Sequence, residues 1–215
     1  MLMSATTTVQ QLMSGATALN VELTLEQAQT LLRLLDELDD WNQRINLTAI
    51  KDREQQVIKH LLDSLSVHRY LRGHHIADIG TGAGFPGLPL ALVNPDRHFT
   101  LIDATAKKLR FVEHAAAVMG VGNVRTLHAR AEAHKPDPRY DCLVSRALGP
   151  IEKFVMWCGA SCASGGRLLA MKGRLPEEEL KQIPNGWKAA VHRLVVPGLD
   201  EERHLVEICR SHERL

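Results

Sequence analysis

The fold is decided by the stretch Asp78-Ile79-Gly80-Thr81-Gly82-Ala83-Gly84-Phe85-Pro86-Gly87, which joins a short apolar run to a helical pattern. Glycine adopts the positive φ angles that such a strand-to-helix turn needs, and it leaves the backbone bare. Pro86 suits the first turn of the helix that follows, and the amino end of that helix carries partial positive charge. Because such a turn binds a phosphate or a carboxylate, the stretch predicts a cofactor loop.

From Gly73 onward, short apolar runs alternate with helical patterns, which is typical of βαβ units and a parallel sheet. The last two runs have only a turn over residues 197–202 between them, so we expect an antiparallel hairpin at one sheet edge. The expected strands are Ile76–Ile79, Phe99–Ile102, Val124–His128, Cys142–Val144, Leu168–Met171, Val191–Val196 and Leu205–Cys209. The expected helices between them are Pro86–Val93, Lys107–Met119, Ile151–Cys162 and Pro176–Gln182. The prediction is therefore an α/β fold with a Rossmann-like, mostly parallel seven-stranded sheet and helices on both faces.

Before Gly73 the pattern is helical throughout. A short helix is expected within residues 9–19. Thr24 and Gln27 have the spacing of a capping box, and a helix is expected from there to about Trp41. Asp52 opens a second helix, whose apolar face extends to Leu71. We therefore expect a helical amino-terminal extension over residues 1–72, packed as one unit with a cofactor-binding domain over residues 73–215.

The composition indicates a soluble globular protein, since 45% of the 215 residues are apolar and 24% are charged. No apolar run approaches the roughly 20 residues that span a bilayer, and residues 1–8 do not have the pattern of a secretory signal. We therefore expect a cytoplasmic monomer that does not contact a membrane. The net charge of +1 does not indicate a nucleic-acid binder, so any RNA site would have to come from a local patch.

The four cysteines contain no Cys-x-x-Cys pair, and we expect all of them to be reduced and structural. Neither a His-Glu-x-x-His motif nor a Walker loop is present, and no metal site is expected.

The glycines of the loop are compatible with two cofactor classes. Gly82-x-Gly84-x-x-Gly87 matches the dinucleotide pattern, and Asp103, at the end of the second strand, fits an acid that holds ribose hydroxyls in either class. Asp78, however, stands two residues before the first glycine, where it would receive an ammonium group and repel a pyrophosphate. The terminal hairpin also resembles the sheet ending of class I methyltransferases. Both features favour S-adenosylmethionine over NAD, and a dehydrogenase remains an alternative.

Two further strand ends carry candidate site residues. Ala131 and Glu132 follow the third strand, beside the expected adenine position. Arg146 follows the fourth strand, which in the class I fold faces the transferred methyl group. Its fork of donors suits an anion or the N7/O6 edge of guanine. His60, Asp63 and Ser64 are neighbours on one expected helix, and we interpret them as local polar contacts rather than a hydrolase triad.

Together with the loop, a set of motifs spread from about Trp41 to Ile208 resembles one known family. The motifs are Trp41-Asn42, Asn46-Leu47-Thr48, His60-Leu61-Leu62-Asp63-Ser64-Leu65, Asp78–Pro89, Lys107-Lys108, Arg110-Phe111, Ser145-Arg146-Ala147, Lys172-Gly173 and Arg203-His204-Leu205. They resemble the RsmG (GidB) family, the bacterial 16S ribosomal RNA guanine-N7 methyltransferases. The segment Thr81–Pro89 is far more specific to that family than a bare glycine pattern.

The resemblance implies a class I methyltransferase whose methyl acceptor is N7 of a guanine in 16S ribosomal RNA or the small ribosomal subunit. Guanine N7 already carries an in-plane lone pair, so no catalytic base is expected, and Arg146 is a candidate for positioning substrate or cofactor. A class I methyltransferase of a protein or small molecule remains an alternative. The expected cofactor-binding residues are Asp78, Gly80, Gly82, Gly84, Phe85, Asp103, Ala131, Glu132 and Arg146. The RNA-binding candidates are Lys107, Arg110, Lys172, Arg203 and His204.

Overall fold

The computed structural model describes residues 2–146 and 148–214. Within this part of the chain, seven strands form one sheet of order β3-β2-β1-β4-β5-β7-β6. The first five strands pair in parallel, whereas β7 runs antiparallel to both β5 and β6. This arrangement confirms the expected sheet and its carboxy-terminal hairpin. The strands are β1 (His75–Ile79), β2 (His98–Asp103), β3 (Val124–His128), β4 (Tyr140–Arg146), β5 (Cys162–Lys172), β6 (Trp187–Leu194) and β7 (Arg203–Arg210).

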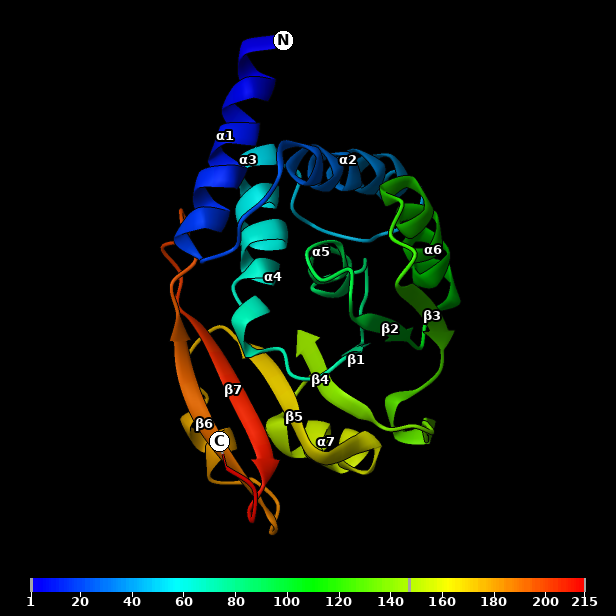
Figure 1. The fold of residues 1–215 in the computed structure, drawn as a ribbon, viewed down its shortest axis with the longest axis vertical. Helices are drawn as coiled ribbons and strands as arrows, with labels where there is room; N and C mark the ends of the chain where they lie inside the picture. Colours follow the sequence, from blue (N-terminus) through cyan, green and yellow to red (C-terminus); the bar gives the residue numbers. More distant parts are fainter. Residues whose placement is uncertain (1, 147, 215) are drawn as a thin grey trace.

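Helices cover both faces of the sheet, as a mostly parallel sheet requires. Alternate residues of each strand enter two separate apolar clusters. One cluster packs against α7, and the other packs against α5, α6 and the amino-terminal helices (Figure 1). The helices after β1 are α5 (Gly87–Leu92), α6 (Ala106–Met119), α7 (Ile151–Cys158) and α8 (Glu177–Leu180), with 3₁₀ turns η3 (Ala131–Ala133) and η4 (Gly159–Ser161).

The amino-terminal segment is helical, as expected. Thr24 caps α2 with the predicted capping box, in which its hydroxyl accepts from the Gln27 N–H and its own N–H donates to the Gln27 side chain. In Figure 1 α2 lies over the same face as α6, and the Trp41 ring packs edge-on against Phe111 at a centroid separation of 5.8 Å. The elements are α1 (Leu2–Ala18), α2 (Leu25–Asn42), α3 (Arg53–Gln56), the π-helical turn η1 (Val57–Leu62), α4 (Asp63–Leu65) and the 3₁₀ turn η2 (His68–Tyr70).

Two expected helices differ from the structure. Asp52 caps α3 as expected, but the helix widens into the π turn η1 and α4 ends at Leu65. The expected helix up to Cys162 ends at Cys158, because Cys162 pairs with Tyr140 and begins β5. π turns are rare and concentrate at functional sites, so η1 marks a segment whose local geometry serves more than the core.

The described residues contain no helix long and apolar enough to cross a membrane. The four cysteines are buried and free, which confirms the structural interpretation.

Candidate active site

The loop after β1 has the conformation that its glycines predict. Gly80, Gly82 and Gly84 have φ angles of +69°, +60° and +84°. Helix α5 begins directly after Pro86, at the carboxyl end of the sheet. Backbone N–H groups of the loop therefore lie where an α/β sheet binds its ligands.

Asp78 holds this loop together from inside the protein. Its side-chain oxygen Oδ2 accepts hydrogen bonds from the Thr81 hydroxyl at 2.6 Å and from the Gly87 N–H at 2.9 Å. A Cβ on Gly87 would lie only 2.8 Å from the same oxygen, so the position requires glycine. The other oxygen, Oδ1, is buried and has no hydrogen-bond partner among the described residues. Burial raises the pKa of Asp78 to about 6, because the carboxylate loses its hydration.

Asp103 ties the end of β2 to the loop. One of its oxygens accepts from the Gly82 N–H at 2.9 Å, and the other accepts from the Thr105 N–H at the start of α6, at 2.8 Å. The side chain therefore supports the start of α6 and borders a cavity at the end of β2.

This first cavity, of about 240 Å³, lies at the carboxyl ends of β1, β2 and β3. We call it the cofactor cavity. It brings together four of the predicted cofactor residues, Gly80, Asp103, Ala131 and Glu132. Leu148 and Trp157 close its far side. The ring of Phe85 and the side chain of Arg146 do not line it.

A second cavity, of about 420 Å³, lies on the other side of β4, at the ends of β4, β5, β6 and β7. We call it the acceptor cavity. It brings Arg146 together with three of the predicted RNA-binding residues, Lys172, Arg203 and His204. Four lining residues come from the amino-terminal segment, Ile50, Lys59, His60 and Asp63, and Met171, Gly173 and Leu194 complete the wall. The contribution of the amino-terminal segment was not predicted from the sequence.

The interpretation of Asp63 as a local polar contact is wrong. Its carboxylate, only 3% exposed, accepts from Arg146 Nη1 at 3.1 Å and from Arg203 Nε at 3.2 Å. Arg146 Nη1 also donates to the backbone carbonyl of Lys59 at 2.9 Å. Asp63 thus joins the amino-terminal segment to β4 and β7. Only Ser64 makes a purely local contact, because its hydroxyl donates to the carbonyl of His60.

His60 also reaches beyond its own helix. Its ring stacks on Phe85 with centroids 4.8 Å apart and an interplanar angle of 14°, and the guanidinium of Arg146 lies 5.5 Å from the centre of the Phe85 ring. Phe85 is 3% exposed and lines neither cavity, so this member of the predicted cofactor set is a buried packing partner of His60 and Arg146. The resemblance motif His60–Leu65 was the one sequence signal that could have identified this cluster.

Two of the predicted RNA-binding residues lie apart from both cavities. Lys107 and Arg110 are exposed on α6 and line neither cavity. Lys172 is held by Glu179 and by the carbonyl of Gly149, each at 2.7 Å from its Nζ atom. Ala147, the third residue of the Ser145–Ala147 motif, lies outside the described residues.

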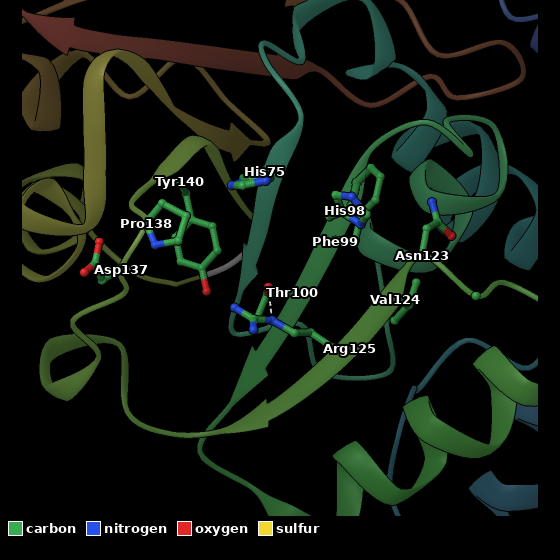
Figure 2. A pocket seen from close by; sticks show the side chains of 11 residues that line it. His75, His98, Phe99, Thr100, Asn123, Val124, Arg125, Asp137, Pro138 and Tyr140 are labelled. Carbon is green, nitrogen blue, oxygen red and sulfur yellow. Dashed lines mark hydrogen bonds between the residues drawn. The ribbon is translucent and has the colours of Figure 1, made fainter.

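A third cavity, of about 300 Å³, lies at the opposite end of the sheet. Figure 2 shows residues from the starts of β1, β2, β3 and β4 around it, with Arg125 of β3 hydrogen-bonded to Thr100 of β2. None of the predicted site residues lines this cavity. Ligands of open α/β sheets bind at the carboxyl ends of the strands, so the cofactor and acceptor cavities are the candidate active site.

Solved structures with the same fold are methyltransferases. A TrmN from Thermus thermophilus aligns with 72% of this chain and 53% of its own at a TM-score of 0.55 and 18% identity. A methyltransferase from Thiobacillus denitrificans, solved with S-adenosyl-L-homocysteine, aligns with 80% of this chain and 98% of its own at a TM-score of 0.55 and 14% identity. The fold is that of the class I S-adenosylmethionine-dependent methyltransferases.

Sequence relatives show to which family of class I methyltransferases the chain is similar. A family model described as rRNA small subunit methyltransferase G (GidB) matches residues 27–206. Two proteins named ribosomal RNA small subunit methyltransferase G align with 94% of this chain. The one from Marinobacter nauticus is 43% identical with 94% of its length covered, and the one from a Shewanella species is 39% identical with 98% covered. The chain belongs to the rRNA small subunit methyltransferase G (GidB) family.

Proposed function

We propose that this chain transfers a methyl group from S-adenosylmethionine to N7 of a guanine in 16S ribosomal RNA. The observation that carries the proposal is the position of the two cavities. The two cavities flank the carboxyl end of β4, where the order of the strands reverses between β1 and β4. Arg146 lines the acceptor cavity, and Leu148 lines the cofactor cavity. A cofactor on one side and an acceptor base on the other would meet at this point.

The residues of the cofactor cavity fit S-adenosylmethionine. Asp78 lies beneath the glycine loop and does not line the cavity, but its buried Oδ1 lacks a partner among the described residues, and an ammonium group, held directly or through a water, would supply one. Asp103 borders the cavity at the end of β2, where it would hold ribose hydroxyls, and Ala131 and Glu132 would lie beside adenine. When bound, S-adenosylmethionine supplies an electrophilic methyl group. We propose no metal for this step.

The acceptor cavity suits a nucleotide of an RNA. Lys59, Arg146, Lys172 and Arg203 line it and offer donors to a phosphate, although Asp63, Glu179 and Glu201 pair with them and offset most of their charge. The transfer carries the methyl group and one positive charge from the sulfonium of the cofactor to N7 of guanine. Guanine loses no proton in this step, so the acceptor cavity needs no general base. Asp63 partly offsets the charge of Arg146 and Arg203, which would otherwise oppose a cationic product.

We further propose a cytoplasmic monomer that acts without contacting a membrane. Its substrate is an assembled or partly assembled small subunit, because the net charge of +1 gives little attraction for naked RNA. The helical extension, residues 1–72, and the methyltransferase domain, residues 73–215, form one unit, since buried residues of both belong to one apolar cluster.

Methylated guanines mapped in 16S ribosomal RNA, from cells with and without the gene, test the proposed acceptor. We expect one N7-methylguanine to disappear with the gene and to return when purified enzyme and S-adenosylmethionine are added to the unmodified subunits. An unchanged N7 pattern would leave a protein or a small molecule as acceptor. Calorimetry with S-adenosylmethionine and NAD tests the cofactor class, and tight NAD binding without a response to S-adenosylmethionine would exclude the proposal.

The substitution Gly82→Asp tests the cofactor loop. A Cβ at Gly82 meets no close atom, with Gly80 O the nearest at 3.9 Å, but the φ of +60° strains any residue other than glycine, so the melting temperature of the variant is measured alongside binding. The new carboxylate would lie beside Asp103, which accepts from the Gly82 N–H, and it would obstruct the backbone approach of a ligand. We expect cofactor binding to be abolished. Gly82→Asn is the matched control, because it adds the same bulk without charge and separates the two effects.

A further inference from the structure

His60 carries a polar atom that the folded chain leaves unsatisfied. The side chain comes from the π turn η1, the residue is 7% exposed, and it lines the acceptor cavity. Its Nδ1 atom is buried without a hydrogen-bond partner among the described residues. Such an atom in an interior calls for an explanation, and a ligand that supplies the partner is one.

The contact with Thr48 allows the proton of the imidazole ring to lie on Nδ1. Thr48 Oγ1 accepts a hydrogen bond from the Ile50 N–H at 3.1 Å and lies 2.9 Å from His60 Nε2. The hydroxyl keeps its single hydrogen, which can donate to Nε2, and its second lone pair can instead accept from an Nε2–H. When Thr48 donates, the neutral ring carries its proton on Nδ1 and the unpartnered atom is a donor, which is the tautomer that the inference below uses.

The ring is held in this state by its environment. Burial and the nearby charge of Arg146 lower the pKa of His60 to about 4, so the imidazole is neutral at physiological pH. Stacking on Phe85 fixes the plane of the ring next to the glycine loop. With its proton on Nδ1, His60 therefore holds an oriented, uncharged N–H donor just inside the wall of the acceptor cavity, next to the cofactor loop.

We propose that His60 donates its Nδ1–H to O6 of the acceptor guanine and thereby selects guanine over adenine. The proposal rests on the proposed function. The N7 edge of guanine presents two acceptors, N7 and O6, and a donor to O6 leaves the N7 lone pair free for the methyl group. Adenine presents an amino group at the same place, so two donors would face each other. Since Nδ1 is enclosed, the base reaches it when a side chain of the cavity wall shifts.

An uncharged donor suits this reaction better than a charged one. Guanine becomes a cation when N7 is methylated, and a protonated imidazole at O6 would repel it. A neutral N–H contacts the oxygen without that cost. The carboxylate of Asp63, on the same cavity wall, adds a negative charge that favours the cationic product.

The test pairs enzyme variants with a substrate that lacks O6. Small subunits are reconstituted with 16S RNA that carries either guanine or 2-aminopurine at the mapped acceptor position. 2-Aminopurine keeps N7 and has hydrogen in place of O6. We expect the loss of O6 to lower kcat/KM about tenfold for the unsubstituted enzyme, the scale of a lost hydrogen bond that leaves a buried donor unpaired.

Two substitutions at His60 separate its nitrogens. His60→Gln places an amide near Nε2 and leaves nothing at Nδ1, so kcat/KM with guanine should fall about tenfold and removal of O6 should then cost little more. His60→Asn places an amide near Nδ1 and should keep most of the activity. Calorimetric affinity for S-adenosylmethionine and the melting temperature should stay close to those of the unsubstituted protein for both variants.

An equal penalty for removal of O6 in the unsubstituted enzyme and in His60→Gln would overturn the inference. So would full activity of His60→Gln on guanine. If His60→Gln does not fold, Thr48→Val is used in its place. This substitution removes the hydroxyl that keeps the proton on Nδ1, so the loss of kcat/KM on removal of O6 should become smaller. If the unsubstituted enzyme methylates no guanine N7, the proposed function itself fails, which is a different result.

Discussion

The guanidinium of Arg146 donates a hydrogen bond of 3.1 Å to the carboxylate of Asp63, a residue 83 positions earlier in the chain. Arg203 donates to the other oxygen of the same carboxylate at 3.2 Å. One buried acid therefore orients two arginines that line the acceptor cavity. It also makes the amino-terminal segment part of the candidate active site rather than a cover over the sheet.

Asp63→Asn should therefore impair acceptor recognition more than cofactor binding. The amide keeps the shape of the side chain but removes the charge that holds both guanidinium groups. We expect kcat/KM on small subunits to fall tenfold or more and the free energy of unfolding to fall by about 1–3 kcal/mol. The affinity for S-adenosylmethionine, measured by calorimetry, should change little. Asp40→Asn is the matched control, since its contact with Arg44 is exposed and 3.8 Å long, and it should have almost no effect.

Gly87→Ala should destabilise the cofactor loop. The added Cβ would lie 2.8 Å from Asp78 Oδ2 and 2.8 Å from Leu101 Cγ, so the buried carboxylate or the strand below it has to shift. Overpacking of this kind costs about 1–3 kcal/mol, and cofactor affinity should fall as well. Urea denaturation and calorimetry measure the two effects. Gly122→Ala, where a Cβ meets nothing within 4 Å, should leave both quantities unchanged.

Asp78 should impose a pH dependence on stability. Its pKa rises from 3.8 to about 6 on folding, so between these values the folded state holds a proton that the unfolded state has lost. The stability contributed by Asp78 is therefore greatest below pH 4, and about 3 kcal/mol is lost as the pH rises to about 6. In Asp78→Asn this dependence should vanish. Denaturation of both proteins from pH 4 to pH 7 tests it, and a constant difference between them would contradict the assignment.

The pH dependence of cofactor affinity gives a second test of the protonation of Asp78. If Asp78 receives an ammonium group, binding requires its ionised form. The affinity of the unsubstituted protein for S-adenosylmethionine should then weaken as the pH falls below about 6, and that of Asp78→Asn should be lower and flat.

The order of strands and helices was predictable because it depends on local patterns. Short apolar runs between helical patterns identified every strand of the sheet, and the capping box at Thr24 located the start of α2. Boundaries were less predictable. The run up to Cys162 looks helical in sequence, but pairing with Tyr140 makes Cys162 part of β5. Likewise no local pattern signals the π turn at residues 57–62.

The candidate site also has a part that could be predicted from the sequence and a part that could not. The glycine loop, Asp103 and the residues after β3 follow strand ends, and parallel strands bring their carboxyl ends to one edge, so sequence order predicts their proximity. The acceptor wall formed by Lys59, His60 and Asp63 does not follow a strand. Its position depends on how the amino-terminal helices pack on the sheet.

The local sequence was enough for the loop, because glycine lacks a Cβ and so permits the positive φ angles that a strand-to-helix turn needs, which Gly80, Gly82 and Gly84 adopt. Only the tertiary structure decided that Asp63 would face Arg146 and Arg203, which lie 83 and 140 positions away in the chain. A charge on a helix has no partner until packing brings one close and excludes water from around it. For that reason the cofactor loop could be predicted from the order of residues, whereas the acceptor cavity is a product of the fold.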